Sequence, residues 1–128
     1  MIAVGSVDFI EGVFEVSTVD RLKAHRSLAR ETRDESLLKL VNLVLNEIRT
    51  YEISKGCHYK ASEKEVQGII SKEVQARKEL AASYHKAADS AQDEESRERF
   101  VIGYYERLSE VGLLSTYLTQ SELEPGVS

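Results

Sequence analysis

The sequence predicts an all-α protein, a small antiparallel bundle of about four helices with a short N-terminal arm or hairpin. Apolar residues recur every three or four positions in four segments, and the 128 residues include only one proline and seven glycines. Short connections between the segments favour antiparallel neighbours. We expect an N-terminal arm over residues 1–17, a helical domain over 18–118 and a C-terminal tail over 119–128.

Composition excludes several classes of protein. Hydrophobic residues make up 41% of the chain and charged residues 30%, which is too apolar for a disordered chain and too charged for a membrane span. The single cysteine excludes an internal disulfide framework and a cysteine-rich zinc site. The first residues lack a basic stretch followed by an apolar run, so we expect no secretory signal and a cytoplasmic location.

The N-terminal segment differs from the rest of the chain. A two-residue turn at Glu11-Gly12 would pair Phe9 with Phe14 and Val7 with Val16 on one face. Because an isolated hairpin is marginal in water, residues 1–17 are interpreted either as a short hairpin or as a loosely ordered arm.

The first helix is expected from about Val19 to Arg33. Ser17, Thr18 and Asp20 are all suitable N-caps. Its apolar line is thin, and four cations follow one another at steps of three and four residues, which places them on one face. This basic stripe consists of Lys23, Arg26, Arg30 and Arg33.

The second helix is expected to follow Asp34 and to run to about Ile53. It is apolar over more than the usual single face, which predicts that it forms the centre of the core. Gly56 suits the left-handed position after a helix. The residues that share its main face are Leu37, Val41, Val44, Ile48 and Tyr51.

The third helix is expected to begin at a capping box and to run to about Ala88. Ser62 and Glu65 have the spacing at which each side chain satisfies a free backbone N–H of the other residue. The apolar residues at helical spacing are Val66, Ile69, Ile70, Val74, Leu80, Tyr84 and Ala87.

The fourth helix is expected to begin near Asp93, with an acidic first turn that suits the positive end of the helix dipole. Its apolar line is Val101, Tyr104, Tyr105, Leu108 and Val111. More apolar residues follow, which is more than a terminal helix of a small bundle is expected to bury. We therefore expect a partner-binding surface formed by Leu108, Val111, Leu114, Tyr117 and Leu118.

Few residues of the chain are candidates for catalysis or metal binding. Cys57 and His58 are adjacent, but a catalytic pair requires the fold to bring the two side chains together, so an exposed loop is the simpler interpretation. The chain has no glycine-rich phosphate loop, HExxH or CxxC motif. We predict no catalytic residue, metal site or cofactor.

Charge distribution points to one candidate interface. The chain has 17 Lys and Arg against 22 Asp and Glu, a net charge of −5, which argues against a uniformly basic nucleic-acid-binding protein. Residues 21–33, however, carry five cations against one anion, and both ends of the chain are acidic. The basic stripe could follow a phosphate backbone, or it could pair with the acidic ends.

The third helix resembles the GatB/YqeY-like family. The stretches that carry the resemblance are residues 62–66, 70–79 and 84–88, which read SEKEV, ISKEVQARKE and YHKAA. The resemblance covers about residues 21–108 and identifies a divergent or truncated member, because family members continue into a second small helical domain. It implies a link to tRNA or to tRNA-dependent amidotransferases, and no catalytic residue.

The function expected from sequence and resemblance is a small non-catalytic accessory or binding module that contacts tRNA or a tRNA-modifying complex. The alternative is a protein–protein adaptor or a helical oligomer that associates through its last helix, without nucleic-acid binding. No membrane partner is expected.

Overall fold

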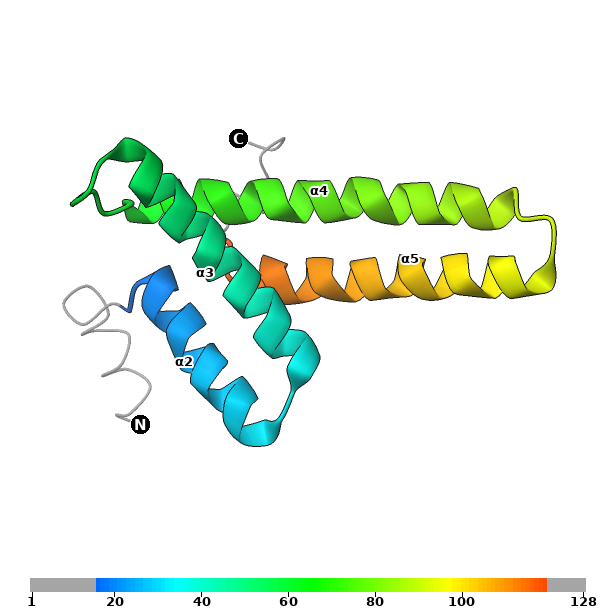
Figure 1. The fold of residues 1–128 in the computed structure, drawn as a ribbon, viewed down its shortest axis with the longest axis horizontal. Coiled ribbons are helices and arrows are strands. Elements are labelled where there is room, and N and C mark those ends of the chain that lie inside the picture. The colour runs from blue at the N-terminus through cyan, green and yellow to red at the C-terminus, as the bar shows by residue number, and fades with distance from the viewer. Residues whose placement is uncertain (1–15, 120–128) are drawn as a thin grey trace, which may run out of the picture. The chain divides into compact units, whose positions relative to one another are not determined.

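The described part of the molecule is entirely helical and confirms the predicted all-α class. The computed structural model describes residues 16–119, which form α2 (Thr18–Thr32), α3 (Glu35–Lys55), α4 (Glu63–Asp89) and α5 (Glu94–Ser115), with no strand among them (Figure 1). The four predicted helix starts and the ends of the first three helices lie within two residues of the observed ones. Residues 1–15 of the predicted arm over 1–17 and residues 120–128 of the predicted tail over 119–128 lie outside the described residues.

The chain divides into two compact units, and the division falls between Asn46 and Glu47, within α3. The first unit contains α2 and the start of α3. Ser17 caps α2, since its Oγ accepts a hydrogen bond from the backbone N–H of Asp20 at 3.1 Å. The buried apolar side chains of this unit are Leu22, Ala29, Leu40, Val41 and Val44.

The turn between α2 and α3 uses an arginine in the left-handed conformation. Arg33 has φ 58° and ψ 38°, its N–H donates to the carbonyl of Arg30, and the N–H of Asp34 donates to the carbonyl of Ala29. This is the Schellman arrangement, in which glycine is the usual residue. The Asp34 carboxylate then accepts from the N–H of Leu37 at 3.1 Å and caps the next helix.

The second unit contains the end of α3 with α4 and α5. α4, of 27 residues, and α5, of 22 residues, lie side by side as an antiparallel hairpin (Figure 1). Asp93 begins α5, because its Oδ1 accepts from the N–H of Ser96 at 2.8 Å, and this hydrogen bond lowers the pKa of Asp93. The larger buried side chains of the unit are Ile48, Val66, Gln67, Ile70, Val74, Leu114 and Tyr117.

The predicted capping box at the start of α4 is present and larger than expected. The N–H of Ser62 donates to Glu65 Oε1 at 2.8 Å, and the N–H of Glu65 donates to Ser62 Oγ at 3.1 Å. The hydroxyls of Tyr51 and Tyr59 also donate to the Glu65 carboxylate. Glu65 therefore ties the end of α3 and the connection after it to the first turn of α4.

Gln67 holds the chain that follows α5. Its Nε2 donates to the carbonyl of Tyr117 at 2.7 Å, and its Oε1 accepts from the N–H of Thr119 at 2.8 Å. Because Gln67 is buried, these two bonds satisfy an amide that would otherwise be costly to remove from water.

Candidate functional site

The basic stripe lies on α2, with one member at the helix end. Lys23 and Arg30 are exposed, and Arg33 leaves the helical spacing because it adopts the left-handed conformation. Arg26 is half-buried, and its Nε is shielded from solvent without a hydrogen-bond partner in residues 16–119. No carboxylate of the described residues forms an ion pair with these four cations.

The connection between α3 and α4 carries Cys57 and His58. Cys57 is exposed, with a free thiol, and lies with His58 along a cavity of about 390 Å³ that Arg49, Glu52 and Lys60 also line. Within residues 16–119, no three His, Cys, Asp or Glu side chains are grouped so as to hold a metal ion.

The residues predicted to bind a partner occupy very different environments. Leu114 and Tyr117 are buried, Val111 and Leu118 are half-buried, and only Leu108 is exposed. Leu114 follows Gly103 and Glu110 on the side of α5 that packs on α4, as the contact between Gly103 and Tyr84 and the ion pair between Arg77 and Glu110 indicate. The exposed surface of α5 therefore differs from the predicted one.

The exposed apolar surface of α5 is a continuous stripe on the side away from α4. Tyr105 exposes 63% of its surface and Ile102 exposes 57%, although the sequence pattern assigned Tyr105 to the core line. Steps of one, three and four residues connect the members, so they share one side of the helix. All members of this outer stripe are exposed: Val101, Ile102, Tyr105, Leu108, Ser109, Gly112 and Leu113.

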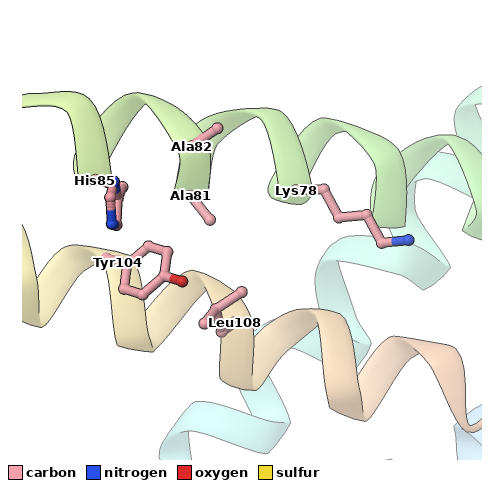
Figure 2. A pocket seen from close by; sticks show the side chains of 6 residues that line it. All are labelled: Lys78, Ala81, Ala82, His85, Tyr104 and Leu108. Atoms are coloured by element: carbon pink, nitrogen blue, oxygen red, sulfur yellow. The ribbon is translucent and has the colours of Figure 1, made fainter.

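A groove between α4 and α5 borders the outer stripe. It has a volume of about 420 Å³, and Figure 2 shows its lining: Lys78, Ala81, Ala82 and His85 from α4, with Tyr104 and Leu108 from α5. The rings of His85 and Tyr104 meet edge to face at 5.3 Å, and the rings of Tyr104 and Tyr105 do so at 5.1 Å. A row of three rings thus leads from the groove to the outer stripe.

Charged side chains cluster where α3, α4 and α5 of the second unit meet. Arg77 Nη1 lies 2.7 Å from Glu73 Oε1, Arg77 Nε lies 3.2 Å from Glu110 Oε1, and Arg107 Nε lies 2.8 Å from the same oxygen. Burial, a hydrogen bond with Glu73 and the like charge of Glu73 together raise the pKa of Glu47 to about 7, while Arg77 opposes the shift.

The pKa of Glu65 is lowered, whereas that of Glu47 is raised. The N–H of Ser62 and the hydroxyls of Tyr51 and Tyr59 hold its pKa at about 2, because all three donate to the ionised carboxylate. The hydrogen bond from Tyr51 to Glu65 is in turn the largest of the effects that raise the pKa of Tyr51 to about 12. Both carboxylate clusters tie helices together, and Tyr59 of the Glu65 cluster also lines the cavity beside Cys57 and His58.

Comparison of the chain with protein families, with characterised proteins and with solved structures finds no match. The resemblance to the GatB/YqeY-like family therefore stays a prediction. No helix of residues 16–119 combines the length and the apolar character needed to cross a membrane.

Proposed function

We propose that the chain is a small non-catalytic helical module that binds another protein through the outer stripe of α5. The observation that carries the proposal is the exposure of Tyr105 and Ile102 on an apolar stripe that exposed carboxylates border only at its N-terminal end, at Glu98, and along one edge, at Glu106. A soluble helix normally places charged residues on the side away from its neighbour. Contiguous exposed apolar surface on a small protein is typical of an interaction site.

The composition of the outer stripe supports a protein rather than a nucleic acid as its partner. Its large side chains are aliphatic or aromatic, and tyrosine is enriched among the residues that contribute most to protein interfaces. A phosphate backbone would require cations, and the outer stripe has none. Specific contacts would come from shape and from the Tyr105 hydroxyl.

Photo-cross-linking tests this proposal in the native host. A benzophenone amino acid in place of Tyr105 is expected to cross-link to protein, whereas the same group in place of Lys86, an exposed residue of α4, is not. Equal yields at both positions, or cross-links removed by ribonuclease, would contradict a protein-binding role for the outer stripe.

The second candidate function is binding to RNA, such as tRNA or the RNA of a tRNA-modifying complex, through the basic stripe. It is supported by the absence of carboxylate partners for Lys23, Arg30 and Arg33 in residues 16–119. Cations that no carboxylate neutralises are available to phosphates. The two proposals concern different helices, so the cross-linking experiment and the salt dependence described in the Discussion test them separately.

A further inference from the structure

We infer that the partner of the outer stripe is the outer stripe of a second copy of this chain, packed antiparallel about a two-fold axis near Arg107. The inference rests on the proposed function and names its partner. A two-fold interface requires one surface to be complementary to itself, and the sizes of the side chains along α5 meet that requirement.

The two small residues of the outer stripe, Ser109 and Gly112, lie in its C-terminal half, and its two most exposed large residues, Ile102 and Tyr105, lie in its N-terminal half. When two such helices run antiparallel about a point near Arg107, Ile102 lies opposite Gly112 and Tyr105 lies opposite Ser109. These two large side chains of one copy then each meet a small residue of the other. In the same register Val101 lies opposite Leu113, an apolar pair, and Leu108 lies opposite Glu106.

Within residues 16–119, packing does not require a glycine at position 112, nor at position 68 of α4. A Cβ built at Gly112 meets no atom within 4 Å, whereas a Cβ at Gly103 would lie 2.6 Å from the ring of Tyr84. Glycine inside a helix is less favourable than alanine. A second helix that approaches at residue 112 provides a reason for the missing side chain.

The charges of α5 favour the antiparallel orientation. Its first turns carry Glu94, Glu95 and Glu98 with Arg97 and Arg99, a net charge of −1, and residues 111–118 carry no charge. Antiparallel pairing places each charged end beside an uncharged end, whereas parallel pairing would bring together two ends of the same net sign. Glu106, at the edge of the outer stripe, has Arg107 Nη2 within 3.5 Å, which reduces repulsion near the axis.

The area available fits a reversible dimer. Since a large side chain exposes about 150–250 Å² when free, the exposed fractions in the outer stripe amount to roughly 500 Å² on each copy. The pair would bury about 1,000 Å² in total, which is the lower limit for a specific protein interface. We therefore expect a dimer that dissociates on dilution in the micromolar range.

Sedimentation of the full chain tests the pairing. The parent is expected to be dimeric at about 0.5 mM and largely monomeric at about 1 µM, and Tyr105→Glu and Gly112→Leu are each expected to weaken association at least tenfold. Leu80→Glu is the matched control, because Leu80 is exposed on α4. A monomeric parent at 0.5 mM, or a dimer unaffected by both variants, would overturn the inference.

The orientation is tested by a distance between spin labels. In a Cys57→Ser background, labels at Glu95→Cys are expected about 35 Å apart in an antiparallel dimer and about 10 Å apart in a parallel one. A distance near 10 Å would overturn the two-fold arrangement. A monomeric parent whose Tyr105 still cross-links to a host protein would overturn self-pairing alone, whereas loss of both results would remove the proposed function as well.

Discussion

The ring of Tyr84 occupies the space that a side chain at Gly103 would need, since a Cβ built there would lie 2.6 Å from Tyr84 Cε1. This contact sets which side of α5 packs on α4. Because that side is fixed, the residues on the opposite side, including Tyr105, are left exposed. The close approach of α4 to α5 at Gly103 and the exposure of the outer stripe are therefore consequences of the same packing.

Gly103→Ala is expected to destabilise the chain by about 1–3 kcal/mol, because overpacking at Tyr84 outweighs the gain in helix propensity. Gly68→Ala, in α4, is the matched control, since a Cβ there meets nothing within 4 Å. It is expected to stabilise the chain by about 0.5–1 kcal/mol. Urea unfolding followed by circular dichroism measures both, and a stabilised Gly103→Ala would contradict the packing described.

The two sides of α5, one packed on α4 and one exposed, illustrate how much of the structure could be predicted from the sequence. Caps at Ser17, Asp34, Ser62 and Asp93 are local signals, and the helices they begin were predicted correctly. Residues 100–118 are apolar on more than one side, however, and periodicity cannot say which side meets α4. Leu114 and Tyr117, which the sequence pattern predicts at the partner surface, are buried in the structure.

Contacts across helices were likewise outside the reach of local patterns. The capping-box spacing predicted the bond between Ser62 and Glu65, but the hydroxyls of Tyr51 and Tyr59 reach Glu65 only through the fold. Leu80 has the helical spacing of a core residue and is exposed, because α4 extends along a single neighbour there. The pairing of Glu47 with Glu73 also depends on how α3 meets α4.

Glu47 is expected to make the chain less stable as pH rises. Its pKa in the folded chain, about 7, lies above the ordinary 4.5, so the folded state binds a proton that the unfolded state releases. This contribution is fully present below about pH 4.5 and is lost as pH rises through about 7. Glu73 and Arg77 are the charged groups that act on Glu47.

Glu47→Gln is the test of this pH dependence. The variant cannot ionise at position 47, so its unfolding free energy is expected to exceed that of the parent at pH 8 and to approach it at pH 5. Urea midpoints at the two pH values measure the difference. A parent that gains stability between pH 5 and 8 relative to the variant would contradict the shared proton between Glu47 and Glu73.

Glu65 is expected to act in the opposite sense. Its pKa of about 2 lies below the ordinary 4.5, so its contribution is present above about pH 4.5 and is lost as pH falls through about 2. Glu65→Gln should therefore lower the thermal midpoint at pH 7 and differ little from the parent near pH 2. An unchanged midpoint at pH 7 would show that the three donors on Glu65 do not stabilise the fold.

Arg33→Gly is expected to stabilise the chain by about 0.5–1 kcal/mol, because a left-handed conformation is unfavourable for a residue with a Cβ. The matched variant Arg30→Gly replaces a residue inside α2 and should destabilise by about 1 kcal/mol. If Arg33 ends the helix as described, the thermal midpoint rises in Arg33→Gly and falls in Arg30→Gly. Equal losses in the two would contradict the turn.

RNA binding by the basic stripe predicts a specific dependence of the affinity on salt concentration. If about three phosphates are contacted, the affinity should fall with a log–log salt slope of roughly −2 to −3. Changing Arg26 and Arg30 together to Glu should abolish binding, with little effect on the thermal midpoint beyond the packing of the half-buried Arg26 stem. A parent that shows no RNA affinity at low salt would remove this second candidate function.

Hydroxyl-radical footprinting in the native host tests the central claim, that the outer stripe of α5 is covered by protein when the chain functions. The oxidation of Tyr105 and Ile102 is compared with that of Ile53, which is exposed on α3, in the host and in the dilute isolated chain. We predict that Tyr105 and Ile102 are protected at least threefold in the host while Ile53 is unchanged. Equal oxidation of Tyr105 in the two settings would contradict the claim.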